Sequence, residues 1–205
     1  FVALCAGGQL IAQQTAGTSP DWARFRGPNG SGLSDAANVP TEFGKTNNMV
    51  WRLPLPPGHS SPIIHRDRIY LTAFRGETLV TYAIDRARGW VIWTREAPNV
   101  KTNIPDKRNN PASPSPSVDD SGIYVFFGDY GLVAYDLDGQ DRWKMPLGPF
   151  DNIYGMGASP IIVGDLLLLA CDQSNGSFLM AVDKQTGQER WKTPRPEAKS
   201  GHATP

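Results

Sequence analysis

Apolar residues in this chain gather in short runs separated by polar turns. The runs "IYLTAF" at 69–74, "IYVFF" at 123–127 and "LLLLA" at 166–170 are apolar enough to be buried on both faces of a sheet. No long segment carries apolar residues at the 3.6-residue period of an amphipathic helix. The pattern therefore predicts an all-β protein.

Turn-forming residues divide the region of the third run into four short strands, at roughly 160–163, 166–172, 177–183 and 189–193. The turns "VGD", "QSNG" and "KQTG" separate these strands. Composition agrees, because 21 Gly and 18 Pro among 205 residues indicate many turns. Charge is balanced at 20 basic and 20 acidic residues with no basic run, which argues against a nucleic-acid partner.

One short motif occurs three times along the chain. "AIDRARGWVIW", "AYDLDGQDRW" and "AVDKQTGQERW" each carry Ala-x-Asp, then Gly, then Trp, and each follows a Ser-Pro pair and an apolar run. A fourth Ser-Pro-like start begins at "GHATP". The repeated residues are Ala83, Asp85, Gly89 and Trp93; Ala134, Asp136, Gly139 and Trp143; and Ala181, Asp183, Thr186, Gly187 and Trp191.

A single copy of this motif would suggest a catalytic site, but its repetition argues for a structural role. A catalytic group is needed once, whereas a packing group is needed in every repeat. We expect Asp and Gly to build the turn between the third and fourth strands, with Asp bonding backbone N–H groups and Gly taking positive φ. We expect each Trp to pack one repeat against the next.

A four-stranded unit repeated every ~45 residues is typical of a β-propeller blade. The predicted blades are 60–98, 115–148 and 157–194, with a long loop at 99–114 and the start of another blade at 200–205. Residues 47–56, which contain Trp51, read as the fourth strand of a last blade, and 17–46 as an N-terminal arm. We therefore expect the N-terminal half of a longer propeller.

The first sixteen residues read as the remainder of a signal peptide. "FVALCAGGQLIA" is apolar and uncharged, and cleavage is expected near Ala12 or Ala16. Twelve residues are too few to span a bilayer, so no transmembrane segment is predicted. The alternative to a signal peptide is a frayed N-terminal strand. Lipidation of Cys5 is not favoured, because Leu4 stands where a lipidation signal has Gly, Ala or Ser. Without this leader Cys171 is the remaining cysteine, and its apolar surroundings predict a core residue.

The third motif, Ala181-x-Asp183-x-x-Thr186-Gly187-x-x-x-Trp191, resembles the tryptophan-docking motif of the quinoprotein (PQQ-repeat) β-propellers. The resemblance covers about 51–205; the first copy has Arg88 in place of Thr, and the second is one residue shorter. The segment "DWARFRGPNGSGLS" also resembles the start of secreted members. The family includes quinoprotein alcohol dehydrogenases and the non-enzymatic assembly scaffold BamB, and the resemblance implies seven or eight blades.

A dehydrogenase of this family would use PQQ with Ca²⁺, a catalytic Asp and, in many members, a vicinal Cys pair. The chain has no Cys–Cys pair, and the residues that would hold the cofactor cannot be mapped onto it. No P-loop, GxSxG or HExxH motif occurs either. We therefore assign no catalytic, cofactor or metal residues.

The three histidines invite a metal hypothesis, which the sequence does not favour. His59 and His202 stand in matching places, "GHSSP" and "GHATP", before the first strand of a blade. No carboxylate is close in sequence to either, so a structural role at the start of a blade is expected. His65 is expected to be an ordinary surface residue.

Loops that precede the first strand of a blade open on the upper face of a propeller. The long loop there offers Lys101, Lys107, Arg108, Asn109 and Asn110, and the loop one blade on adds Asp151 and Tyr154. Extra loop length on a rigid ring commonly carries function. With His59 and His202, these residues form a candidate binding face; a solvated loop without a partner is the alternative.

The expected function is that of an exported, periplasmic or extracellular propeller that binds or scaffolds a protein or small-ligand partner without catalysis. The alternative is a quinoprotein oxidoreductase that uses PQQ and Ca²⁺ on an alcohol or sugar. A third possibility is a structural module of a larger polypeptide.

Overall fold

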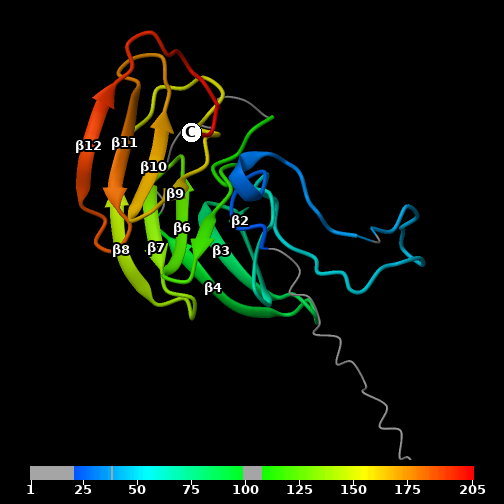
Figure 1. The fold of residues 1–205 in the computed structure, drawn as a ribbon. Coiled ribbons are helices and arrows are strands. Elements are labelled where there is room, and N and C mark those ends of the chain that lie inside the picture. The colour runs from blue at the N-terminus through cyan, green and yellow to red at the C-terminus, as the bar shows by residue number, and fades with distance from the viewer. Residues whose placement is uncertain (1–20, 38, 99–107) are drawn as a thin grey trace, which may run out of the picture.

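The computed structural model describes residues 21–37, 39–98 and 108–205. These residues form three antiparallel sheets of four strands each (Figure 1). The first has β1 (Ile63–His65), β2 (Arg68–Arg75), β3 (Thr78–Asp85) and β4 (Val91–Ala97). The second has β5 (Ser117–Asp119), β6 (Gly122–Phe127), β7 (Gly131–Tyr135) and β8 (Asp141–Pro146). The third has β9 (Ile161–Val163), β10 (Leu166–Cys171), β11 (Phe178–Asp183) and β12 (Glu189–Pro194). The predicted all-β class is confirmed.

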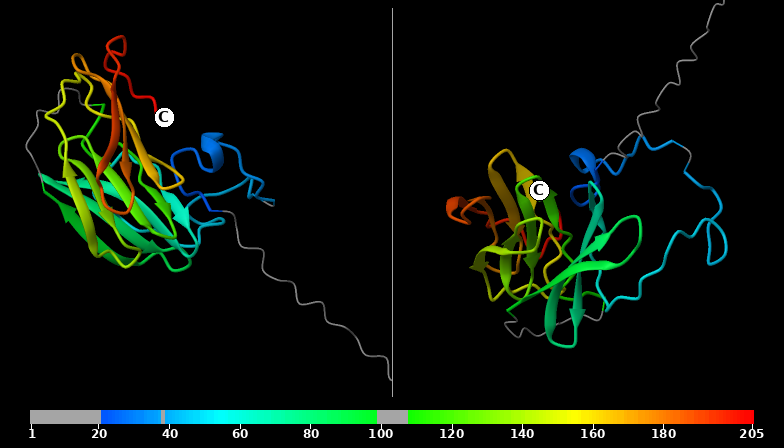
Figure 2. Two further views of the ribbon diagram at one scale, coloured as in Figure 1. Left: turned by 60° about the vertical axis from the view of Figure 1, so that its left-hand side comes forward. Right: turned by 90° about the horizontal axis from the view of Figure 1, so that it is seen from below.

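The sheets are successive blades that stand side by side (Figures 1 and 2), and within each the strands follow sequence order. We call them blades 1, 2 and 3. Their first strands β1, β5 and β9 contact one another in turn. We call "upper face" the end where β4 leads to β5 and β8 to β9, and where the β2–β3, β6–β7 and β10–β11 hairpins turn. The remaining hairpins form the lower face.

The aspartate of each repeated motif organises the turn between the third and fourth strands. In blade 3, Asp183 Oδ1 accepts hydrogen bonds from the N–H groups of Gln185 and Thr186, each at 2.9 Å. A further hydrogen bond from Arg190, together with these turn amides, lowers the pKa of Asp183 to about 2. Gly187 follows with φ of +73°, a conformation that favours glycine.

The tryptophan of one blade lies on this turn of the next blade. A Cβ atom on Gly139 would lie 2.8 Å from Trp93 Cδ2, and one on Gly187 would lie 2.7 Å from Trp143 Cδ2. The indole N–H groups of Trp93 and Trp143 donate to the carbonyls of Leu137 and Lys184 at 3.1 and 2.9 Å. Glycine is therefore required at this position for two reasons: its φ is positive, and the indole ring occupies the space that a Cβ would need.

Trp51 and Trp191, the first and last tryptophans of the repeated series, have different surroundings. Trp51 packs over Gly89 and donates to the carbonyl of Arg86 at 2.9 Å, although 47–56 contain no assigned strand. Trp51 therefore makes the same contact with the turn of blade 1 that Trp93 makes with the turn of blade 2. Trp191 is 38% exposed, because no blade follows β12 in the described residues. The predicted packing role of Trp191 therefore stays a prediction.

The cores lie between blades rather than within one. Tyr70 of blade 1 and Tyr135 of blade 2 flank Trp93, each with ring centroids 6.0 Å from it. A second core joins blades 2 and 3 and contains Cys171, whose thiol pKa is raised by burial. Cys171 is therefore an inert core residue.

The residues that precede the blade prolines form a hydrogen-bonded chain across the blades. Ser61 N–H donates to Ser115 Oγ at 2.8 Å, Ser115 N–H to Ser159 Oγ at 2.9 Å, and Ser159 N–H to Thr204 Oγ1 at 3.1 Å. Each hydroxyl thus satisfies a backbone donor of the blade before it. This use of the hydroxyls agrees with a structural role for the Ser-Pro pairs.

The N-terminal arm adds to the first strands of blades 1 and 2. Trp22 and Ile64 exchange backbone hydrogen bonds of 2.8 and 3.0 Å, and Val118 N–H donates to the carbonyl of Ala23 at 3.0 Å. Its one helical turn is a 3₁₀ turn at Pro28–Gly30.

A salt bridge joins blades 2 and 3 at the lower face. Lys184 Nζ lies 2.8 Å from Asp119 Oδ2, and both side chains are mostly buried. Burial by itself would raise the pKa of Asp119, but hydrogen bonds from Lys184 and Ser121 outweigh it and lower the pKa. The hydrogen bond to Asp119 raises the pKa of Lys184.

Trp93→Ala should lower the free energy of unfolding of the full-length protein by about 3–5 kcal/mol, because it empties the space between two blades. Urea unfolding followed by far-ultraviolet circular dichroism would measure this loss. Trp90 lies in the same blade but is 57% exposed, so Trp90→Ala should stay within about 0.5 kcal/mol of wild type. Equal effects of the two changes would contradict the packing role of Trp93.

Lys184→Gln should lower the free energy of unfolding by about 1 kcal/mol near neutral pH. The lowered pKa of Asp119 stabilises the fold above its ordinary value of 3.8, and this stabilisation is lost as pH falls through the lowered value. The raised pKa of Lys184 stabilises below 10.5, and this is lost as pH rises through the raised value.

Urea unfolding across pH should therefore show the deficit of the Lys184→Gln variant at neutral pH and its disappearance at strongly acid and strongly alkaline pH. Lys199→Gln changes an exposed lysine in the segment that follows β12; it serves as the control and should show no such profile. A deficit that stays constant with pH would contradict the ion-pair origin.

Candidate functional site

Four segments of the upper face meet in one surface, which we call the upper-loop cluster: His59, Arg108, Asn109, Tyr154 and His202. The Asn109 amide donates to the carbonyl of Tyr154, and the Arg108 guanidinium lies 5.5 Å from the centre of the Tyr154 ring. On the other side, the rings of Tyr154 and His202 are 6.1 Å apart.

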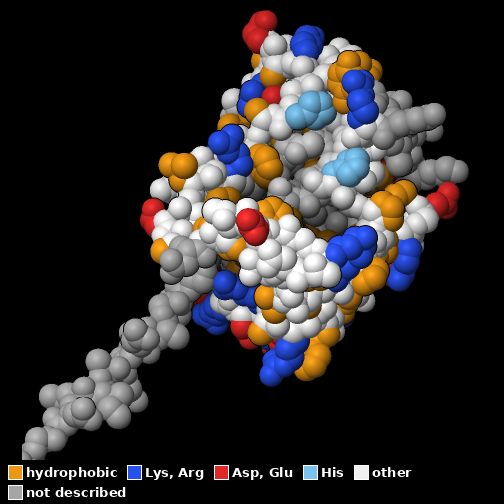
Figure 3. Space-filling model, turned by 90° about the vertical axis from the view of Figure 1, so that its right-hand side faces the viewer, with side chains coloured by type: hydrophobic (Ala, Val, Ile, Leu, Met, Phe, Trp, Pro, Cys, Tyr) orange, Lys and Arg blue, Asp and Glu red, His pale blue; other side chains and the backbone are white. Residues whose placement is uncertain are grey.

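His59 joins this cluster through a serine. The Ser113 hydroxyl donates to Asn109 Oδ1 and lies 3.4 Å from His59 Nδ1. Figure 3 shows two histidine side chains near each other on one face of the molecule, with lysine and arginine side chains around them. Residues from four parts of the sequence therefore contribute to one exposed surface.

Glycines allow these loops to approach closely. A Cβ on Gly157 would lie 2.8 Å from His202 Nδ1, and a Cβ on Gly155, which has φ of +75°, would lie 2.8 Å from Asn109 Nδ2. Any side chain at these positions would push the loops apart.

The remaining candidates lie apart from this cluster or outside the described residues. Asn110 stabilises the turn in which it lies, because its Oδ1 accepts a hydrogen bond from Ala112 N–H at 2.9 Å. Asp151 lies against the β10–β11 hairpin, where its Oδ2 accepts from the Asn175 amide at 3.3 Å. Lys101 and Lys107 lie outside the described residues.

His65 is buried, so the expectation of an ordinary surface residue is wrong. Its side chain is 6% exposed, and its Nδ1 lies 2.6 Å from Asp21 Oδ2 of the N-terminal arm. Its Nε2 lies 3.1 Å from Asp120 Oδ1 without hydrogen-bond geometry. The three residues line a lower-face cavity of about 490 Å³. No local sequence pattern indicates this burial, because Asp21 is 44 residues away.

The upper-loop cluster presents side chains that can contact a ligand or a partner. It offers an aromatic ring, an amide, two imidazoles and a guanidinium. The Ser113 hydroxyl is directed to Asn109, and no described carboxylate is bonded to His59, so the pair lacks the third group that orients a catalytic base.

The described residues do not provide a ligand set for the Ca²⁺ that accompanies PQQ. No group of three or more His, Cys, Asp or Glu side chains among them could hold a metal ion. Asp172 is the buried carboxylate of this face, and its Oδ2 is paired with Arg195 at 3.2 Å. Its Oδ1 has no partner, but one carboxylate oxygen is far fewer than the 6–8 oxygens that Ca²⁺ takes.

In the part of the chain that the structure describes, no helix has the length and apolar character needed to cross a membrane.

Solved structures with a similar fold include dehydrogenases and an assembly factor. A europium-containing methanol dehydrogenase matches with a TM-score of 0.62 at 15% identity, over 86% of this chain and 32% of that one. A quinohemoprotein alcohol dehydrogenase from Pseudomonas putida matches at 0.57 and 22% identity, over 70% and 22%. BamB from Moraxella catarrhalis matches at 0.50 and 17% identity, over 72% and 39%.

These likenesses show the fold alone, and the chain spans only 22–39% of the length of these proteins. A comparison with curated protein sequences gives no significant match. A family profile described as outer membrane protein assembly factor BamB matches residues 41–204, which is most of the chain. The chain therefore belongs to this BamB-like family of PQQ-repeat β-propellers.

Proposed function

We propose that this chain is part of an exported propeller that binds a protein partner in the cell envelope through the upper-loop cluster, without catalysis. The observation that carries the proposal is the convergence of His59, Arg108, Asn109, Tyr154 and His202 on one exposed surface. An aromatic ring beside a guanidinium and an amide is the kind of surface that anchors a peptide.

The family and the sequence supply the setting. The matching profile is described as an outer membrane assembly factor, which supports a protein partner rather than a small substrate. The apolar start of the chain supports export.

A quinoprotein dehydrogenase is the second candidate, because two of the similar structures are described as dehydrogenases. In such an enzyme PQQ would supply the redox chemistry. The described residues lack a Ca²⁺ ligand set, so this candidate depends on residues outside them.

The binding proposal predicts site-specific cross-linking. A photo-reactive amino acid in place of Tyr154 of the full-length protein should give discrete adducts with envelope proteins of the native host. The same amino acid in place of Trp90, which is 57% exposed in a lower-face hairpin, is the control and should give none. Gel shifts and mass spectrometry would identify the adducts.

Arg108→Glu should weaken the Tyr154 adduct at least several-fold without changing the melting temperature, since charge reversal removes the cation beside the ring. Adducts of equal yield at both positions, or none at Tyr154, would contradict the proposal. Calorimetry with PQQ and Ca²⁺ tests the second candidate: micromolar, Ca²⁺-dependent binding would favour a dehydrogenase, and no binding would count against it.

A further inference from the structure

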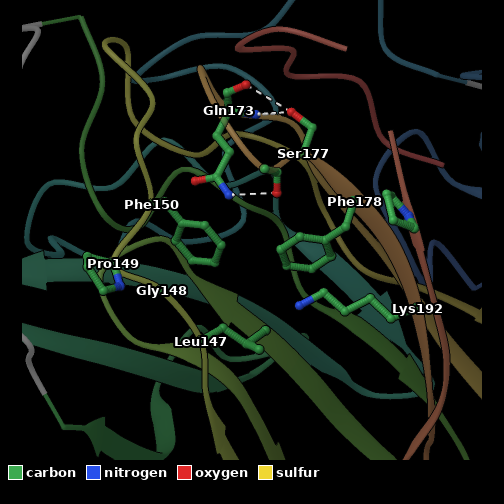
Figure 4. A pocket seen from close by; sticks show the side chains of 10 residues that line it. Leu147, Gly148, Pro149, Phe150, Gln173, Ser177, Phe178 and Lys192 are labelled. Carbon is green, nitrogen blue, oxygen red and sulfur yellow. Dashed lines mark hydrogen bonds between the residues drawn. The ribbon is translucent and has the colours of Figure 1, made fainter. Parts of the chain in front are cut away.

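A cavity of about 520 Å³ opens between blades 2 and 3 at the outer rim of the upper face. Leu147, Pro149 and Phe150, which follow β8, form one wall, and Phe178 and Lys192 of blade 3 form the other (Figure 4). The volume falls in the range of small-molecule sites. Both walls belong to described residues, so the cavity needs no further blade to form it.

The walls present aromatic side chains. Figure 4 shows Phe150 and Phe178 on opposite sides of the opening, with Lys192 extending from β12 toward it. Phe150 is held by an edge-on contact with Phe126, with ring centroids 5.7 Å apart and planes at 82°. Phe178 is 8% exposed and packs in the core between the two blades. The rings are therefore fixed before any ligand arrives.

The neutral polar groups at the cavity are already used by the protein. Gln173 Oε1 accepts from Asp151 N–H at 2.8 Å, and its Nε2 donates to the carbonyl of Gly176 at 3.0 Å. The Ser177 hydroxyl accepts from Gln173 N–H at 2.9 Å and lies 2.7 Å from the carbonyl of Ala198. These groups shape the cavity and leave little for a ligand to bind.

Lys192 is the exception. Its Nζ lies 3.8 Å from the centre of the Phe178 ring, and no carboxylate among the described residues pairs with it. An ammonium has three donors, and a ring face uses none of them fully. The cavity therefore combines two aromatic walls with one cation that is available to an anion.

The repeat shows that this combination is not required for blade packing. The positions equivalent to Phe178 are Val80 and Gly131, five residues before the motif aspartate in each blade. The position equivalent to Lys192, directly after the motif Trp, is Thr94 in blade 1 and Lys144 in blade 2. Lys144 is paired with Asp141, so blade 3 alone of the three has the aromatic ring with an unpaired lysine.

We propose that this cavity binds a small aromatic monoanion, with its ring between Phe150 and Phe178 and its anionic group on Lys192. The apolar walls favour a planar ring by burial and stacking, and the single available cation selects a single negative charge. The site is separate from the upper-loop cluster, and the inference does not depend on the proposed function.

The test uses the full-length protein and two probes that differ only in charge, 2-naphthoate and the neutral 2-naphthamide. Isothermal titration calorimetry should show saturable binding of 2-naphthoate and binding of 2-naphthamide that is about tenfold weaker, since one charge-assisted hydrogen bond corresponds to about this ratio. Equal affinity for both probes, or no binding of 2-naphthoate at millimolar concentration, would overturn the proposal.

Two lysine variants locate the binding. Lys192→Gln should weaken 2-naphthoate binding about tenfold and leave 2-naphthamide unchanged, because it removes the ammonium that pairs with the carboxylate. Lys144→Gln, at the equivalent position of blade 2, should leave both affinities unchanged. Both lysines are exposed, so neither change should alter the melting temperature. Wild-type affinity of the Lys192→Gln variant for 2-naphthoate would place the binding elsewhere and overturn the proposal.

Phe178→Leu tests the aromatic wall. It should weaken both probes to a similar degree, because it removes stacking and leaves the charge in place. Unchanged affinity for both would exclude Phe178 as a wall of the site, and a lower melting temperature would show the accompanying loss of core packing. These results are independent of the Tyr154 cross-links, so either proposal can fail without the other.

Discussion

The structure depends on the stacking of a tryptophan indole on the turn glycine of the next blade. The ring fills the volume that a Cβ would need, and its N–H donates to the carbonyl that follows the motif aspartate. Both requirements are met only when the turn has one shape, which Asp and Gly together produce. The contact therefore sets the distance and register between neighbouring blades, and the large side chains of Tyr70, Trp93 and Tyr135 pack in the space between blades 1 and 2.

The position of the upper loops follows from this packing and from the serine chain near the first strands. Ser61, Ser115, Ser159 and Thr204 connect the start of each blade to the next, so the loops that precede them leave from fixed points. The loops themselves carry none of the inter-blade tryptophan contacts. Their residues can therefore vary without loss of the ring geometry, which is the usual arrangement of binding loops on a rigid scaffold.

The sequence predicted what is local and repeated. The strands of blade 3 and the turns around Asp183 could be derived because each depends on neighbours within about ten residues, and repetition separated packing groups from chemistry. His65 was misjudged because its partner Asp21 lies in the arm, whose path along β1 and β5 no local pattern specifies. Trp191 is 38% exposed, and the described residues contain no following sheet for it to pack on, so its predicted packing role stays a prediction. The cavity beside Lys192 was also missed, although comparison of Val80, Gly131 and Phe178 across the repeats contained a signal for it.

Agreement and difference among the three blades are therefore both informative. Where the three blades agree, as at the motif Asp, Gly and Trp, the shared residue is explained by a contact that every blade must make. Where they differ at equivalent positions, packing alone gives no reason for the difference. Blade 3 has Phe178 where the other blades have Val80 and Gly131. Lys192 lies beside this ring and, unlike Lys144, has no carboxylate partner among the described residues. In a fold built from repeated interfaces, such departures from the repeat are where a function specific to this protein would be placed.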